Sequence, residues 1–208
     1  MNKLRVGICG WGNVATGLFR TLQTNSVEIK KRSNLEIEII AIGARRDNPK
    51  CDPGNVIIER DIFKIIDHDI DVVVELIGGI DVARDLILKA LNAKKHVVTA
   101  NKAVIFNHGD ELFSVANKNG VKLLYESSVC AGTPIIKLLN QELAASKISK
   151  ISGMLNGTSN FILSNMEEGM EFEPTLKLAQ EKGYAEPDPS FDLSLIHIPS
   201  PRDTVRSR

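Results

Sequence analysis

A glycine-rich turn between an apolar stretch and an amphipathic stretch, close to the start of the chain, is the feature that most constrains the fold. Residues 4–9 (LRVGIC) are apolar and include β-branched side chains, which predicts a buried strand. Val14, Leu18 and Leu22 follow at helical spacing. The intervening GWGNVA matches G-x-G-x-x-[G/A], and its position between a strand and a helix makes the match informative.

Each small residue of this turn has a physical task in binding a dinucleotide. Gly10 permits the sharp turn, Gly12 lets the backbone approach a pyrophosphate, and Ala15 lets the helix lie close to the strand. The phosphates would then lie against the first amides of the helix. The alternative is a glycine-rich turn that binds no ligand. The pattern predicts a cofactor-binding turn made of Gly10, Trp11, Gly12, Asn13, Val14 and Ala15.

The pattern of apolar segments extends this unit into a parallel sheet. Four further strands are expected at residues 36–43, 71–79, 96–100 and 121–126. Helical patterns at 82–91 and 111–119 separate some of these strands. Strands that alternate with helices favour an α/β fold with a Rossmann-type, doubly wound parallel sheet, over residues 1–128.

Two arginines follow the second expected strand, where Rossmann domains contact the ribose of the cofactor. Arg45 and Arg46 would favour the 2′-phosphate of NADP over the free ribose hydroxyl of NAD. Asp47 is adjacent and could serve the ribose of NAD instead. A third possibility is that both arginines are simply solvated loop residues.

Composition narrows the class of partner. Lys+Arg and Asp+Glu each number 26, so the zero net charge argues against nucleic acid and favours a small-molecule substrate. The three cysteines are widely spaced, which fits neither a disulfide framework nor structural zinc. We find neither a secretory signal nor an apolar run of membrane-spanning length, so we expect a soluble cytoplasmic protein without a membrane partner.

The character of the sequence changes after residue 128. Thr133 and Pro134 resemble a helix start, and apolar spacing continues that helix to Leu143. A strand is expected within ISKISGML (148–155), followed by helices at about 159–168 and 174–182. Residues 129–193 therefore read as part of a second domain with a strand and helices.

Five stretches together resemble the homoserine dehydrogenase family: ELIGG (75–79), VVTANK (97–102), ESSVCAGTPII (126–136), NGTSN (156–160) and GYAEPDP (183–189). The resemblance covers residues 4 to about 193. It implies NAD(P)H-dependent interconversion of L-aspartate 4-semialdehyde and L-homoserine, on the route to threonine, methionine and isoleucine. The alternatives are another Rossmann oxidoreductase acting on a small carbonyl compound and a non-catalytic NADP-binding module.

The resemblance also implies roles for particular residues. Hydride delivery to an aldehyde leaves charge on oxygen, and Lys102 follows a strand at the sheet edge where a cation would lower that barrier. Glu186 matches a substrate-contacting glutamate and is the second catalytic candidate, and Asp188 is a weaker candidate. The expected substrate contacts are Gly157, Thr158, Tyr184, Glu186 and Asp192, and further cofactor contacts are Gly78, Thr99 and Lys102.

A monovalent-cation site is implied near the junction of the two parts. The Glu126 carboxylate and the carbonyls of Val129, Ala131 and Thr133 match the family's site for Na⁺ or K⁺. The alternative is an ordinary hydrogen-bonded carboxylate at a strand end.

The last fifteen residues depart from the family. SLIHIPSPRDTVRSR (194–208) has no helical periodicity and predicts a disordered, foreign or misread tail. His197 in this tail is a poor catalytic candidate. A second catalytic lysine and the remainder of the substrate domain are expected after Asp192 and do not follow. We therefore expect a truncated chain with little activity, in which residues 129–193 are an incomplete α+β substrate domain. The resemblance implies a homodimer for the full-length form.

Overall fold

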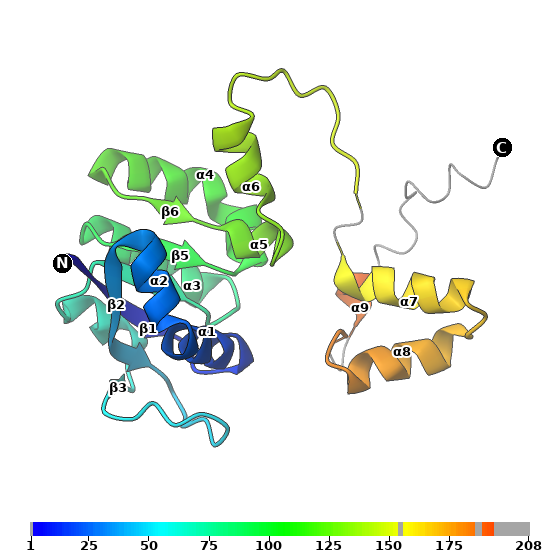
Figure 1. Ribbon diagram of the computed structural model, residues 1–208, viewed down its shortest axis with the longest axis horizontal. Helices are drawn as coiled ribbons and strands as arrows, with labels where there is room; N and C mark the ends of the chain where they lie inside the picture. The colour runs from blue at the N-terminus through cyan, green and yellow to red at the C-terminus, as the bar shows by residue number, and fades with distance from the viewer. Residues whose placement is uncertain (1, 154–155, 186–188, 194–208) are drawn as a thin grey trace. The chain divides into compact units, whose positions relative to one another are not determined.

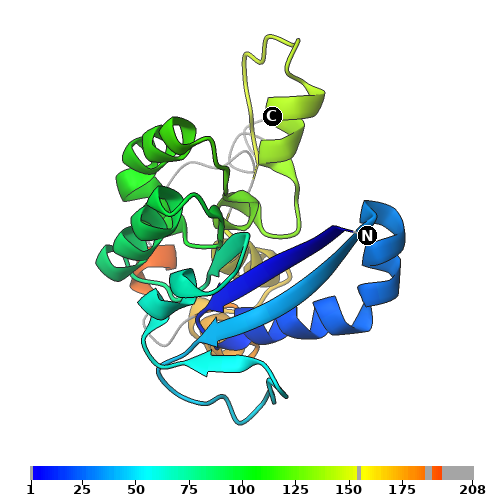
Figure 2. The same cartoon turned by 90° about the vertical axis from the view of Figure 1, so that its left-hand side faces the viewer.

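Six parallel strands form one sheet in the computed structural model of this chain, which describes residues 2–153, 156–185 and 189–193 (Figures 1 and 2). The strand order is β3-β2-β1-β4-β5-β6. The order reverses at β1, because the chain runs outward first toward β3 and then toward β6. The strands are β1 (Asn2–Cys9), β2 (Leu35–Gly43), β3 (Ile57–Glu59), β4 (Val72–Glu75), β5 (His96–Thr99) and β6 (Leu123–Leu124).

Helices cover both faces of the sheet. Because strand side chains alternate, Ile8 packs into a cluster with Ala15 and Phe19, and Cys9 packs into a second cluster with Leu86 and Leu112. This confirms the doubly wound, Rossmann-type sheet. The helices of this part are α1 (Asn13–Thr24), α2 (Ser26–Ser33), the 3₁₀-helix η1 (Ile62–Asp67), α3 (Asp81–Asn92), α4 (Lys102–Asn119), α5 (Glu126–Cys130), α6 (Ile135–Lys137) and the π-helix η2 (Leu138–Glu142).

Several boundaries differ from those that the sequence predicts. β4 ends at Glu75 rather than at residue 79, because Gly78 and Gly79 have φ values of 70° and 74°. Helix α4 begins at Lys102 rather than 111, since the Asn101 side chain caps it by accepting a hydrogen bond from the Val104 amide. The predictions missed α2, which has no buried residue and so no apolar stripe to detect.

The chain divides into two compact units, Met1–Ala144 and Ala145–Arg208. Residues 129–144 therefore group with the sheet, whereas the sequence suggests a boundary after residue 128, which stays a prediction. The described part of the second unit contains helices α7 (Gly157–Glu167), α8 (Phe172–Glu181) and α9 (Ser190–Leu193).

The small core of the second unit centres on Ile162, Ala179 and Ala185. Helices α7 and α8 confirm the two predicted helices closely. The strand predicted at 148–155 was wrong over 148–153, which has no regular structure; residues 154 and 155 lie outside the described residues. The described part of this unit offers no other strand to pair with it, and an unpaired strand leaves its backbone groups without partners.

Candidate functional site

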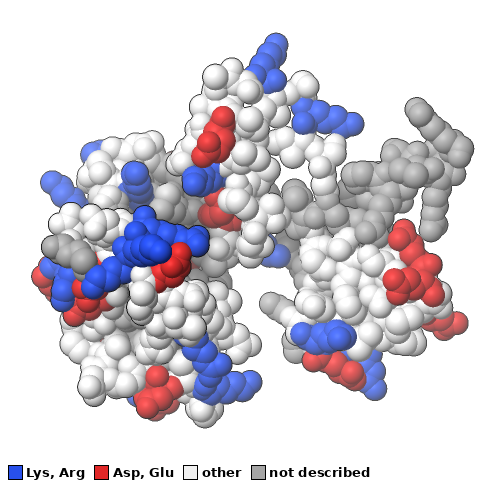
Figure 3. All heavy atoms as spheres, viewed as in Figure 1, with Lys and Arg blue, Asp and Glu red and all other residues white. Residues whose placement is uncertain are grey.

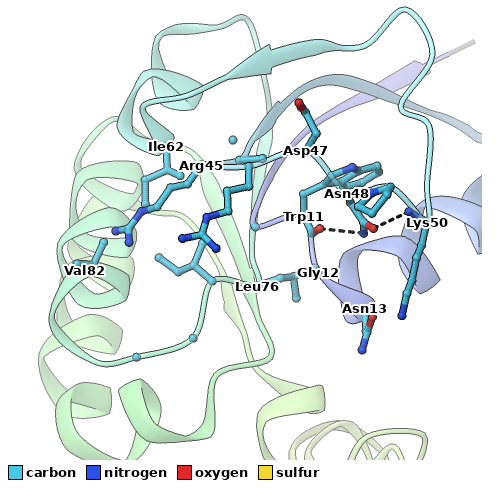
Figure 4. A pocket seen from close by; sticks show the side chains of 18 of the residues that line it. Trp11, Gly12, Asn13, Arg45, Asp47, Asn48, Lys50, Ile62, Leu76 and Val82 are labelled. Atoms are coloured by element: carbon cyan, nitrogen blue, oxygen red, sulfur yellow. Dashed lines mark hydrogen bonds between the residues drawn. The ribbon is translucent and has the colours of Figure 1, made fainter. Parts of the chain in front are cut away.

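A cleft of about 930 Å³ lies at the carboxyl ends of β1, β2 and β4 (Figure 4). Three segments and the side chain of Ile62 line it, the segments being the turn at residues 10–13, the loop 43–50 and the loop 76–82. This is where the strand order reverses, and ligands of open parallel sheets bind at such switch points. A volume of this size is ample for a small-molecule cofactor.

The two turn glycines have different physical roles. Gly10 has a φ of 104°, and a Cβ there would lie 2.5 Å from the carbonyl oxygen of Leu76. Its amide donates a 2.8 Å hydrogen bond to the carbonyl of Gly43, which joins the turn to the end of β2. A Cβ at Gly12, by contrast, would meet no atom within 4 Å. Gly10 is required by the fold, and Gly12 leaves space for a ligand.

The start of α1 points into this space. Gly12 is its N-cap, and no described side chain caps the first amides of the helix. Trp11 and Asn13 line the cleft, and the Trp11 ring packs edge-on against Phe19 at 5.2 Å between centroids. Ala15 is completely buried, as close packing of helix and strand requires. Val14 is 62% exposed and does not line the cleft.

The loop after β2 places charged groups along the cleft. Arg45 and Arg46 are exposed and both line it, and Figure 4 shows Arg45 extending into the cleft. Asp47 also lines the cleft, but its carboxylate points away from Gly12 (Figure 4) and accepts a 2.6 Å ion-paired hydrogen bond from Arg60. Of the groups after β2, the two arginines therefore face the ligand space most directly.

Asn48 is a residue that sequence reasoning missed. Its amide nitrogen donates to the carbonyl of Trp11 at 3.0 Å and to the hydroxyl of Thr16 at 2.9 Å, and its oxygen accepts from the Lys50 amide (Figure 4). It thus ties the loop after β2 to the start of α1. The only sequence signal is the turn-forming Asp-Asn-Pro run, which does not reveal a partner 37 residues away.

A buried carboxylate connects the two inner strands. Glu75, at the end of β4, is fully buried and accepts hydrogen bonds from the Ile77 amide and the Thr99 hydroxyl. Burial, with a further contribution from Glu75, raises the pKa of the neighbouring Cys9 thiol to about 12. Cys9 is therefore a neutral thiol at physiological pH.

The same network reaches the start of α4. The Asn101 amide donates to the Thr99 hydroxyl at 3.0 Å, and the Asn101 side chain donates to the Gly79 carbonyl at 2.7 Å. Lys102, exposed in the first turn of α4, is held next to the loop that borders the cleft. Gly78 lines the cleft. Thr99 and Lys102 do not, and their contact with a cofactor stays a prediction.

The Glu126 carboxylate has protein partners at both oxygens. It begins α5, rather than ending a strand, and accepts from the amides of Ile136 at 2.8 Å and Lys137 at 3.0 Å. The Thr133 carbonyl accepts from the Ile135 amide. This geometry is that of a hydrogen-bonded carboxylate at a helix start. The cation site at Glu126, Val129, Ala131 and Thr133 stays a prediction.

The second unit brings three predicted substrate residues together. Asn156 caps α7 by accepting from the Ser159 amide at 2.7 Å, with Gly157 as the first helical residue. The Thr158 hydroxyl donates to the carbonyl of Tyr184, whose ring lies 4.9 Å from that of Phe161. Glu186 and Asp188 lie outside the described residues, as does the side chain of Asp192.

Charges of both signs lie beside one another on the face shown in Figure 3. Lys3 pairs with Glu38 at 3.0 Å, and Lys30 pairs with Glu36 at 3.5 Å.

Within the described residues, every helix is too short or too polar to span a bilayer.

The reversed strand order, the Gly10–Gly12 turn and the cleft beneath it define a Rossmann-type nucleotide-binding protein. The model of the homoserine dehydrogenase NAD-binding domain matches residues 10–126, and that of homoserine dehydrogenase itself matches 134–197. The chain belongs to the homoserine dehydrogenase family. This confirms the resemblance seen in the sequence motifs.

Relatives and solved structures agree with this assignment. The chain is 49% identical to the homoserine dehydrogenase of Pseudomonas aeruginosa, covering 94% of the chain and 46% of the relative. It matches the crystal structure of a homoserine dehydrogenase from Thiobacillus denitrificans with a TM-score of 0.85 and 42% identity, over 92% of this chain and 45% of that one. A hyperthermophilic archaeal homoserine dehydrogenase in complex with NADPH matches with a TM-score of 0.78 and 27% identity, over 93% of this chain and 66% of that one. The chain spans about half the length of the curated relatives it matches.

Proposed function

We propose that this chain carries the cofactor-binding half of an NADP(H)-dependent homoserine dehydrogenase, which interconverts L-aspartate 4-semialdehyde and L-homoserine. The observation that carries the proposal is the open space over Gly12 at the start of α1, within a cleft at the sheet's switch point. Uncapped amides there suit a pyrophosphate. The family's NADPH-bound archaeal member supports a nicotinamide dinucleotide as the ligand.

Lys102 is the proposed catalytic residue of this part. A bound reduced nicotinamide would supply the hydride that the aldehyde carbon takes up, and the aldehyde oxygen would then carry negative charge. A lysine ammonium close to that oxygen stabilises the charge or donates the proton. The Glu75–Thr99–Asn101 network supports this role, because it fixes the first turn of α4 against the Gly79 carbonyl.

The substrate's amino-acid end is proposed to bind the second unit. Gly157, Thr158 and Tyr184 cluster at the start of α7, and Glu186 with Asp192 would supply acidic groups for an ammonium. Of these, Tyr184 is 56% exposed and can reach a ligand, whereas the hydroxyl of buried Thr158 is already bonded to the Tyr184 carbonyl. Glu186 is the proposed second catalytic residue.

NADP is the proposed cofactor, with NAD as the alternative. Arg45 and Arg46 line the cleft after β2, where a 2′-phosphate would lie, and their guanidinium groups suit it. Replacing both with alanine should weaken NADPH binding more than NADH binding. Equal losses for the two nucleotides would refute the preference.

Further parts of the proposal come from the family as a whole. They are a role in threonine, methionine and isoleucine biosynthesis in the cytoplasm, a homodimer in the full-length protein and Na⁺ or K⁺ at Glu126. A selective rise in melting temperature with Na⁺ or K⁺ would support the cation, and no selective effect would count against it.

The test uses Trp11, the single tryptophan, which lines the cleft. Titrating the folded 208-residue chain with NADPH should quench its fluorescence, because the nucleotide binds next to the ring. No change with either reduced nucleotide would refute the proposal. We also expect little turnover of aspartate semialdehyde by this chain, and robust turnover would overturn that expectation.

A further inference from the structure

Arg60 follows β3 and reaches back to the loop that lines the cleft. Its Nη2 atom donates to Asp47 Oδ1 at 2.6 Å, and its Nη1 atom donates to the Ala44 carbonyl at 3.3 Å. The Ala44 amide in turn donates to the Glu59 carbonyl at 2.8 Å. Arg60 is therefore fixed to the loop at two points, next to the place where β2 and β3 end.

Asp47 is the acidic residue on this stretch of the cleft, and its charge has consequences for the ligand. An unpaired carboxylate after β2 accepts hydrogen bonds from ribose hydroxyls and repels a 2′-phosphate. In the structure this carboxylate is turned away from Gly12 and paired with Arg60 (Figure 4). The cationic groups that line the same stretch are Arg45, Arg46 and Lys50.

We propose that Arg60 is a positioning residue that selects 2′-phosphorylated nucleotides by holding Asp47 in an ion pair outside the ribose site. Arg60 does not line the cleft, so it acts through Asp47 rather than by touching the nucleotide. The inference rests on the proposed dinucleotide-binding function. The ion pair disfavours NAD, because it keeps the Asp47 carboxylate from accepting hydrogen bonds from the ribose hydroxyls.

The pair is partly solvated, and this sets the size of the expected effect. Exposed fractions are 54% for the Arg60 side chain and 83% for that of Asp47. An ion pair so exposed contributes little to stability, so removing it should leave the fold intact. The weakness of the pair also limits its effect on selectivity to a few-fold, but a freed carboxylate near the ribose acts in opposite directions on the two nucleotides, which makes the change measurable.

The experiment measures dissociation constants for NADPH and NADH through Trp11 fluorescence, at fixed ionic strength. Arg60→Ala should lower the NADPH-over-NADH preference by about three- to fivefold, with NADPH bound more weakly and NADH more tightly. Asp47→Asn alone should change the preference by less than about twofold, because its charge is already neutralised. The double variant Arg60→Ala/Asp47→Asn should regain most of the wild-type preference.

Arg20→Ala is the matched control. Its guanidinium donates to the Lys50 carbonyl at 2.7 Å, so its removal loosens the same loop without freeing an acid, and the preference should not change. An unchanged preference in Arg60→Ala, or a loss that Asp47→Asn does not reverse, would overturn the inference while nucleotide binding by the wild-type chain upholds the proposed function. Failure of the wild-type chain to bind either nucleotide would refute both.

Discussion

The two units of this chain, Met1–Ala144 (unit one) and Ala145–Arg208 (unit two), differ in the size of their buried apolar cores. Unit one buries seventeen apolar residues on one face of its sheet and ten on the other, whereas the described part of unit two buries three. The parallel sheet gives unit one a core on both faces. The difference teaches that a sheet covered on both faces builds a large core, while the described part of unit two packs around a small helical core.

The difference in core size follows from the higher ratio of surface to volume in a smaller unit. A small unit buries a smaller fraction of its surface, so it recovers less hydrophobic free energy for each residue that it orders. The segment 148–153 shows the consequence, since its strand-like sequence has no regular structure.

The largest effect is expected at Gly10, which the tight turn requires and which also lines the cleft. Gly10→Ala should cost about 3–5 kcal/mol, because it adds a Cβ against the Leu76 carbonyl at a φ where side chains are strained. Gly12→Ala, which meets no atom within 4 Å, should keep its stability and lose NADPH affinity by at least about tenfold. Urea unfolding and nucleotide titration measure the two effects. Equal stability of the two variants would contradict this distinction.

The next test compares the two cores directly. Leu86→Ala and Ile162→Ala each remove a fully buried side chain, at a cost of about 2–5 kcal/mol. In unit one this should lower the unfolding midpoint while the sheet survives. In unit two it should abolish the helical packing and open residues 157–181 to proteolysis, with NADPH binding retained. Loss of NADPH binding in Ile162→Ala would show that the units are not independent.

A smaller effect is expected from the buried carboxylate of unit one. Glu75→Gln keeps the shape of the side chain but places its N–H₂ group opposite the Ile77 amide or the Thr99 hydroxyl, which donate to the carboxylate in the wild type. This should cost about 1–3 kcal/mol of stability. Thr99→Val is the matched variant, since it removes the other partner of the same bond. Urea unfolding should give a double-variant cost well below the sum of the single costs. Strict additivity would contradict the coupling.

The smallest effect concerns acid stability. Hydrogen bonds from the Arg5 side chain, and then from its amide, hold the pKa of Asp71 below its usual value. A lowered pKa stabilises the fold above about pH 4 and loses that contribution as pH falls through the folded-state pKa. The stability gap between wild type and Asp71→Asn should therefore shrink on acidification, in the unfolding of unit one alone. A gap that widens would show the sign to be wrong.

Sequence patterns were most informative where structure is local or periodic. The glycine turn predicted the strand, turn and helix at residues 2–24, and the apolar runs located β2, β4 and β5. Short elements were missed, such as β3, which has only three residues, and α2, which buries no residue. Their existence depends on neighbours in space, not on their own sequence.

The sequence by itself determined the class of fold, the family and the glycine turn between β1 and α1, because strand periodicity and glycine conformational freedom are properties of short segments. Only the tertiary structure decided that Asp47 pairs with Arg60, that Asn48 bridges to Trp11 and that Glu75 reaches Thr99. Those pairs lie 13, 37 and 24 residues apart. Strand order in the sheet brings them together, and no local pattern encodes that order.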